Sequence, residues 1–182
     1  MKKDCAIIVA IDKKRGIGRN GSIPWTLSED MRHFKDITTK ARGKGQRNVV
    51  IMGRKTWESI PEKFRPLKDR INIVLTKMPD FELPLGVIKA QSLADAFNSI
   101  KKIKDVKIYR TFIIGGGEVY NEAINIPEVS RLYITHVDKE FECDVFFPSF
   151  EKQFNKYFSA PVKVENGLKY YFCEYRRMKK AS

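Results

Sequence analysis

The chain has few cysteines and histidines and no long apolar run. Three cysteines and two histidines occur among 182 residues, and Cys5, Cys143 and Cys173 are too scattered for a metal site or a disulfide framework. We expect core thiols of a reducing compartment, with the cytoplasm as the location, and no bound metal. No apolar run is long enough to cross a bilayer. The short run 5–11 is followed by the charged segment 12–15, so it predicts a buried strand rather than a signal peptide.

The sequence also lacks repeats, low-complexity segments and any Gly/Ser/Pro-rich linker. Hydrophobic residues make up 42% and aromatic residues 12% of the chain, which excludes a disordered protein. A chain of this length fits one compact domain. We therefore expect a single domain over residues 1–182.

Acidic side chains are in the minority. There are 22 of them against 35 lysines and arginines, a net charge of +13, and residues 1–91 carry 20 basic against 10 acidic residues. This surplus suits anionic ligands such as phosphates and carboxylates. A nucleic-acid-binding module is an alternative with the same charge. It is disfavoured because the basic residues are spread along the chain and the aromatic ones lie largely in apolar runs.

Short runs rich in β-branched residues alternate with stretches of helical periodicity. The predicted strands are residues 6–11, 48–52, 71–75, 87–88, 111–114, 132–137 and 170–175. The predicted helices are 28–38 and 92–101, with Ser28 and Ser92 as N-caps. This alternation predicts an α/β domain with a mostly parallel sheet, an antiparallel C-terminal edge strand, and a ligand site at the carboxyl ends of the strands.

Two segments near the start carry candidate site residues. Glycines 16, 18 and 21 form a loop before Pro24 and Trp25. The glycines do not open a helix directly, because Pro24 follows them, so the loop is not a dinucleotide-binding fingerprint. In the predicted helix after it, Asp30 shares a face with Phe34. A carboxylate facing apolar groups takes part readily in proton transfer. Glu29 is an equal candidate on sequence grounds.

Two further segments suit phosphate binding. A strand that ends at Gly53 is followed by Arg54, Lys55 and Thr56 at the start of a short helix. Another apolar strand is followed by the glycine run 115–117 and a helix that begins at Gly117. Strand, glycines and helix in this order allow the backbone to approach a pyrophosphate.

In their order and spacing, these segments resemble the dihydrofolate reductase family. The resemblance rests on the segments 16–18, 24–25, 30–34, 52–61, 65–70 and 114–116, together with Asp144-Val145-Phe146-Phe147-Pro148. The match at 57–70 looks like the eukaryotic branch, whereas an aspartate at position 30 looks more bacterial. The likeness implies a dihydrofolate reductase-like fold and reduction of 7,8-dihydrofolate to tetrahydrofolate with NADPH, which supplies one-carbon metabolism and thymidylate synthesis.

The resemblance also implies a role for each matching residue at the substrate. Asp30 would anchor the pterin and favour protonation of its N5, while Trp25 and Thr135 would hold water and the carboxylate there. Arg70 would bind the α-carboxylate of the folate glutamate. The implied substrate-binding residues are Val9, Ala10, Ile23, Asp30, Met31, Phe34, Ser59, Ile60, Phe64, Leu67, Arg70, Ile114 and Tyr120.

The implied NADPH contacts come from five segments of the chain. They are Ala10, Ile17, Gly18, Gly21, Ser22, Gly53, Arg54, Lys55, Thr56, Thr76, Lys77, Gly115, Gly116, Gly117, Glu118, Val119 and Tyr120. In the family the peptide bond between Gly115 and Gly116 is cis, and the loop 16–25 closes over the nicotinamide. Lys77 and Arg54, with no acidic residue after strand 71–75, favour the extra phosphate of NADPH.

The sequence departs from the family pattern at two positions. Gln91 stands where many relatives carry a basic residue, which weakens the expected preference for NADPH over NADH. Gly117 stands where alanine or a hydroxyl residue is usual, which puts one phosphate contact in question.

A related NADPH-dependent reductase of a riboflavin precursor is a second alternative, but it gives no reason for combining Asp30, Phe34 and Arg70. The expected partners are dihydrofolate and antifolate-type small molecules. We expect a monomer with no membrane and no obligate nucleic acid.

Overall fold

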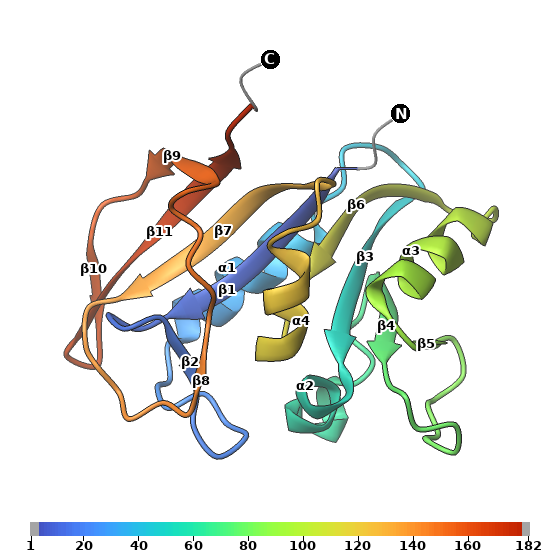
Figure 1. Ribbon diagram of the computed structural model, residues 1–182, viewed down its shortest axis with the longest axis horizontal. Helices are drawn as coiled ribbons and strands as arrows, with labels where there is room; N and C mark the ends of the chain where they lie inside the picture. The colour runs from blue at the N-terminus through green and yellow to red at the C-terminus, as the bar shows by residue number, and fades with distance from the viewer. Residues whose placement is uncertain (1–3, 180–182) are drawn as a thin grey trace.

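The computed structural model of the protein describes residues 4–179, and its backbone is organised around one large sheet. The sheet has nine strands, in the order β10-β11-β7-β1-β6-β3-β4-β5, and β9 also pairs with β11 (Figure 1). The strands of this sheet are β1 (Cys5–Ile11), β3 (Gln46–Gly53), β4 (Arg70–Leu75), β5 (Ile88–Ala90), β6 (Lys107–Ile113), β7 (Val129–Val137), β9 (Phe154–Ser159), β10 (Lys163–Glu165) and β11 (Leu168–Arg177).

The sheet is parallel from β7 to β5 and antiparallel beyond β7. Strand β1 pairs in parallel with β6 and β7, and β3 pairs in parallel with β4 and β6. Strand β11 runs antiparallel to β7, with β9 and β10 antiparallel to it in turn. This confirms the predicted α/β fold with a mostly parallel sheet and an antiparallel C-terminal part.

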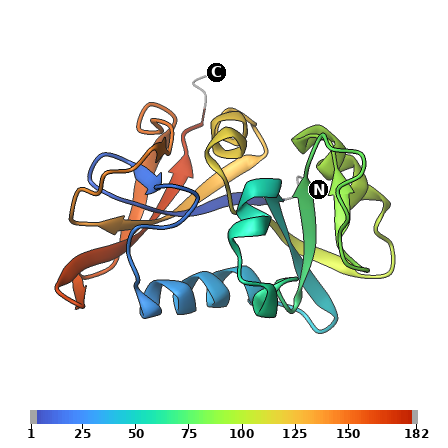
Figure 2. The ribbon, with the colours of Figure 1, turned by 90° about the horizontal axis from the view of Figure 1, so that it is seen from below.

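Helices cover both faces of the sheet. Helix α1 (Ser28–Thr39) lies on one face, and α3 (Leu93–Lys102) and α4 (Gly117–Ala123) lie on the other (Figure 2). The short helix α2 (Arg54–Ser59) follows β3 directly, and the 3-10 helix η1 (Glu62–Phe64) comes after it. Helices on both faces require strands that are apolar on both sides.

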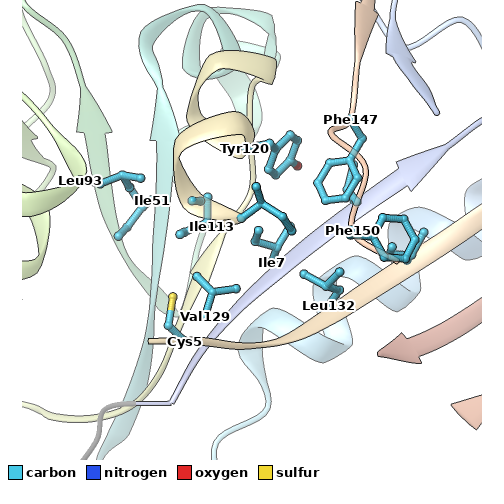
Figure 3. Close-up of a cluster of buried hydrophobic side chains, with 14 of the residues drawn as sticks. Cys5, Ile7, Ile51, Leu93, Ile113, Tyr120, Val129, Leu132, Phe147 and Phe150 are labelled. Atoms are coloured by element: carbon cyan, nitrogen blue, oxygen red, sulfur yellow. The ribbon is translucent and has the colours of Figure 1, made fainter. Parts of the chain in front are cut away.

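The core follows from the alternation of side chains along the central strands. On β1, Ile7 belongs to the large cluster beneath α3 and α4, whereas Ile8 packs with Phe34 of α1 and Trp57 of α2. Figure 3 shows Ile7 among the side chains of the large cluster. Full burial of a side chain such as Ile7 contributes about 1.5–3 kcal/mol. The two clusters fix the sheet between its helices and hold the carboxyl ends of β1, β3 and β6 in place.

Two short strands and two edge strands were not predicted. Strands β2 (Gly16–Gly18) and β8 (Val145–Phe146) form a separate pair, and β9 and β10 extend the antiparallel edge. The helices occur where expected, and Ser92 caps α3 by accepting a hydrogen bond from the Asp95 amide. The predicted Ser28 cap is wrong. Ser28 is the first residue of α1, and its hydroxyl donates to Glu165 instead.

Candidate functional site

The centre of the candidate site is a hydrogen bond between a helix and a strand. Thr135 Oγ1 on β7 donates to Asp30 Oδ1 on α1 over 2.6 Å. Burial is the main cause that raises the pKa of Asp30 above its usual value, the hydrogen bond from Thr135 acts against it, and the negative charge of Glu165 adds to the rise. A carboxyl group with a raised pKa keeps its proton further towards neutral pH, as proton transfer requires.

The structure separates the two acids that the sequence left equal. Glu29 forms an ion pair with Lys163 and accepts a 2.8 Å hydrogen bond from the hydroxyl of Tyr170. These two hydrogen bonds, with Lys163 first, lower the pKa of Glu29. Glu29 is therefore held as a structural anion, and Asp30 is the acid suited to proton transfer.

Trp25 lies at the same end of the sheet and brings a buried donor. Its indole ring is 8% exposed and packs against Phe141 at 5.0 Å between ring centroids. Its Nε1 has no hydrogen-bond partner among residues 4–179. Because a buried N–H group without an acceptor is costly, this atom can serve as a donor to a ligand or to water.

Several of the predicted substrate contacts gather in one apolar group. Ile114 belongs to the buried cluster that contains Ile8 and Trp57, and Phe34, Ile60 and Leu67 pack against this cluster. Three more predicted contacts are large apolar side chains that stand exposed, each by more than half of its surface: Ile23, Met31 and Phe64. Val9 is separated from these predicted substrate contacts, because its side chain belongs to the cluster on the opposite face of the sheet.

Within residues 4–179, Arg70 is held by neutral hydrogen-bond acceptors and forms no ion pair. Its Nη1 donates to Thr38 Oγ1 over 2.8 Å, its Nε donates to the Lys68 carbonyl over 2.9 Å, and its guanidinium lies 6.0 Å from the ring centroid of Phe34. Burial lowers its pKa. Within the described part of the chain no carboxylate lies within ion-pairing distance of Arg70, so it can bind the carboxylate of a ligand.

The glycine backbone after β6 lies close to the end of β3 and to α2. The peptide bond between Gly115 and Gly116 is cis, as the resemblance implies, and Gly115 has a φ of 127°. The Gly53 amide donates to the Gly115 carbonyl over 2.7 Å. A Cβ at Gly116 would lie 3.1 Å from Thr56 Oγ1. Side chains here would fill the space between the ends of β3 and β6, so the glycines leave backbone open to a ligand.

Tyr120 of α4 packs next to Gly115 and against β1. Its ring is buried, and its hydroxyl donates to the Ile8 carbonyl over 2.9 Å. Burial raises the pKa of Tyr120 far above its usual value. The phenol is therefore neutral and ties α4 to β1.

The predicted phosphate-binding cations differ in whether they already form an ion pair. Arg54 is paired with Glu58, with its Nη1 at 2.8 and 2.7 Å from the two carboxylate oxygens. Lys55 and Lys77 are exposed and form no ion pair within residues 4–179. Exposed lysines without partners fit the phosphates of NADPH, and Arg54 could join them only by sharing its charge with Glu58.

The other predicted cofactor contacts come from several elements of the fold. Thr76 is buried, and its hydroxyl accepts from the Met78 amide. Ser59, which was predicted as a substrate contact, donates to the Thr56 carbonyl. The remaining predicted contacts come from β1, the glycine loop and the first turns of α4: Ala10, Ile17, Gly18, Gly21, Ser22, Gly117, Glu118 and Val119.

The glycine loop 16–25 is held at its base by a buried residue that the sequence analysis missed. Asp12 is 2% exposed, and its carboxylate accepts hydrogen bonds from the amides of Lys14, Gly16 and Phe141. An aspartate directly after a buried strand and before a glycine turn was the available signal. Asp12 thus fixes where the loop leaves the sheet.

Two further features bear on the class of protein. Residues 4–179 contain no group of three His, Cys, Asp or Glu side chains that could hold a metal ion. Within the same residues no helix is long and apolar enough to span a membrane. The fold defines an α/β protein with a mostly parallel sheet, and the candidate site lies at the carboxyl ends of its parallel strands.

Comparisons with known proteins identify the family. The dihydrofolate reductase family model matches residues 4–177. The chain is 44% identical to the dihydrofolate reductase of Sus scrofa over 93% of its own length and 96% of that relative, and 44% identical to that of Mus musculus over 93% and 95%. It is also 35% identical to a Glycine max protein named bifunctional dihydrofolate reductase-thymidylate synthase, over 100% of the chain but only 35% of that relative.

The chain belongs to the dihydrofolate reductase family, whose enzymes reduce dihydrofolate with NADPH as the hydride donor. This confirms the predicted family, and the predicted enzyme class and cofactor are those of that family. The chain spans about a third of the length of the bifunctional plant relatives.

Proposed function

We propose that this chain reduces 7,8-dihydrofolate to tetrahydrofolate, with residues 1–182 acting as a single reductase domain. The observation that carries the proposal is the partly buried Asp30, hydrogen-bonded to Thr135 at 2.6 Å and carried by the same helix as Phe34. When bound, NADPH supplies the hydride. The protein supplies position, proton control and exclusion of water.

Asp30 and its neighbours act on the pterin ring. The carboxyl group of Asp30 holds the amino group and adjacent ring nitrogen of the pterin, and Thr135 fixes the direction of that carboxyl group. The raised pKa of Asp30 keeps a proton available for N5 of the substrate. Trp25 Nε1 is the donor that orients water between them.

The rest of the substrate lies along the apolar group. Phe34, Ile60 and Leu67 contact the ring system between the pterin and the glutamate. Arg70 binds the α-carboxylate of the glutamate. The absence of an ion pair for Arg70 among the described residues supports this role.

NADPH is held by the backbone of the glycine run and by nearby cations. Gly115 and Gly116 admit the nicotinamide end, and Thr56 and Lys55 contact the phosphates. Lys77 neutralises the additional phosphate that distinguishes NADPH from NADH. The loop 16–25, fixed at its base by Asp12, covers the reacting atoms and excludes water.

The finer expectations on partners and location belong to the same proposal. The enzyme acts as a monomer in the cytoplasm, takes antifolate-type molecules at the substrate site and needs no nucleic acid. Sedimentation at several protein concentrations tests the monomer, since a concentration-dependent mass would contradict it. Unchanged turnover after nuclease treatment supports independence from nucleic acid, and a loss of turnover would contradict it.

The loss of NADPH absorbance on mixing with dihydrofolate and the protein tests the activity. We expect oxidation that depends on dihydrofolate and is faster with NADPH than with NADH. A riboflavin-precursor analogue serves as the control substrate. Turnover of that analogue, with none of dihydrofolate by folded protein, would overturn the proposed substrate.

A further inference from the structure

Helix α1 begins without a cap from its own segment. Its N-cap residue is Leu27, which offers no side-chain acceptor, and the first amides of a helix need acceptors from outside it. Glu165 of β10 supplies them. Its Oε1 accepts from the Ser28 amide at 2.7 Å and the Ser28 hydroxyl at 2.6 Å, and its Oε2 accepts from the Glu29 amide at 3.2 Å.

A second set of contacts joins the same hairpin to the same turn of α1. Lys163, two residues before Glu165, forms an ion pair with Glu29, and the Tyr170 hydroxyl on β11 donates to the other oxygen of that carboxylate. Backbone and side chains at the start of α1 are thus both held by the β10–β11 hairpin.

The local sequence explains why Glu165 reaches the helix. Asn166 and Gly167 have φ angles of 51° and 75°, and they join β10 to β11 where Glu165 pairs with Leu168. An Asn-Gly pair with positive φ at both positions gives a tight two-residue hairpin. The turn places Glu165 at the end of its strand, next to the start of α1.

We infer that Glu165 is a positioning residue for Asp30: it fixes the first turn of α1 so that the Asp30 carboxyl group meets Thr135. The inference rests on the proposed function, which gives Asp30 its part in proton transfer. Asp30 directly follows the two residues that Glu165 binds. A shift of this turn would move Asp30 away from its 2.6 Å contact with Thr135.

Glu165 acts on the pKa of Asp30 in two opposite ways: its charge raises that pKa, and the Thr135 contact that it positions lowers it. After burial, the negative charge of Glu165 is the other influence that raises the pKa of Asp30, and the hydrogen bond from Thr135 opposes both. The polar and titratable groups around this turn come from four elements: Thr135 of β7, Lys163 and Glu165 of β10, Tyr170 of β11, and Glu29, Arg32 and His33 of α1. Removing the charge of Glu165 therefore lowers the pKa of Asp30, and less of it is protonated at neutral pH.

Three variants separate the effect of the Glu165 charge from the effect of the Glu165 side-chain shape and from a change in the net charge of the protein. Glu165→Gln keeps the shape and an oxygen acceptor but removes the charge, and Glu165→Ala removes both. Asp36→Asn removes one negative charge from the exposed side of the same helix, where Asp36 acts on His33 rather than on Asp30. The first readout is a carboxyl carbon NMR titration of the protein alone, with the Asp30 signal assigned through Asp30→Asn. The second is the pH profile of hydride transfer in a single turnover.

We expect the titration midpoint of Asp30 to fall in Glu165→Gln and to stay at the wild-type value in Asp36→Asn. In Glu165→Ala the loss of the Thr135 contact acts against the loss of charge, so its midpoint should lie above that of Glu165→Gln. In Glu165→Gln, the fall of the hydride-transfer rate with rising pH should move to lower pH by the same amount. An unchanged midpoint in Glu165→Gln and Glu165→Ala, with only a lower melting temperature, would show a purely structural cap and overturn the inference. Failure of the wild type to reduce dihydrofolate would overturn the proposed function instead, because the NMR titration reads Asp30 without substrate.

Discussion

Thr135 Oγ1 and Asp30 Oδ1 lie 2.6 Å apart although 105 residues separate them in the sequence. The strand register explains the contact. Thr135 on β7 pairs with Ala10 near the carboxyl end of β1, and α1 packs on the face of the sheet there. A hydroxyl that donates to a partly buried carboxylate stabilises its charged form, while burial favours its protonated form. In Asp30 burial is the stronger influence.

Asp30→Asn should raise stability at neutral pH. The folded-state pKa of Asp30 is raised, so the folded protein binds its proton more tightly than the unfolded chain. Stability is then lost as the pH rises from the unfolded towards the folded pKa, and the full penalty is present above both. Asparagine carries no charge and can still accept from Thr135. Its melting temperature should exceed that of the wild type at neutral pH and converge with it in acid, and a constant difference at all pH values would contradict the raised pKa.

Arg70→Leu should weaken substrate binding far more than it slows the chemical step. The loss is roughly 2–5 kcal/mol if the guanidinium and the carboxylate form a desolvated pair. Titration calorimetry compares dihydrofolate with a pteridine that lacks the glutamate, and only dihydrofolate should lose affinity. Lys68→Ala, an exposed neighbour, is the control. Equal losses for both ligands would show that Arg70 supports the site rather than binding the carboxylate.

Gly117→Ser should destabilise the protein, and Val145→Ala should relieve much of the loss. A Cβ at Gly117 would lie 2.5 Å from Cγ1 of Val145 on β8, so the side chain at 145 occupies the space that a family hydroxyl would need. Overpacking of this kind costs about 1–3 kcal/mol. Chemical denaturation of both single variants and the double variant measures the coupling. Additive effects would mean that Val145 does not restrict position 117.

Lys77→Gln should reduce the preference for NADPH over NADH. The lysine is exposed and has no ion pair within residues 4–179, so its loss removes one charged contact worth about 1.5 kcal/mol, or about tenfold in selectivity. The ratio of kcat/KM for the two cofactors measures this. Lys44→Gln, an exposed lysine before β3, should leave the ratio unchanged. The same ratio in both variants would exclude Lys77 from the cofactor site.

The central strands could be predicted because their pattern is local. Buried parallel strands such as β3 appear in the sequence as continuous runs rich in β-branched residues. The start of α3 could be predicted from Ser92 alone, because serine is a common N-cap residue. Strand β9 could not be found this way, because after Phe154 all of its residues are exposed and no alternation remains. The hairpin at Asn166-Gly167 had a clear local signal that the sequence analysis did not use.

The site was predictable in its residues but not in its electrostatics. The choice between Asp30 and Glu29 depends on Lys163 and Tyr170, which lie more than 130 residues away from Glu29. No spacing in the sequence indicates that these two groups meet one acid and leave the other. The pairing of Arg54 with Glu58, by contrast, could have been read from their spacing of four residues in a helix.

The rate of hydride transfer in a single turnover, measured across pH for Asp30→Asn and Glu29→Gln, tests the central claim most directly. Asp30→Asn should be slower than the wild type by on the order of 10²-fold or more at neutral pH. The deficit should shrink in acid, where solvent protonates the substrate. Glu29→Gln should keep most of the rate. Full activity of Asp30→Asn at neutral pH, together with a loss in Glu29→Gln, would contradict the assignment of Asp30 as the proton-controlling group.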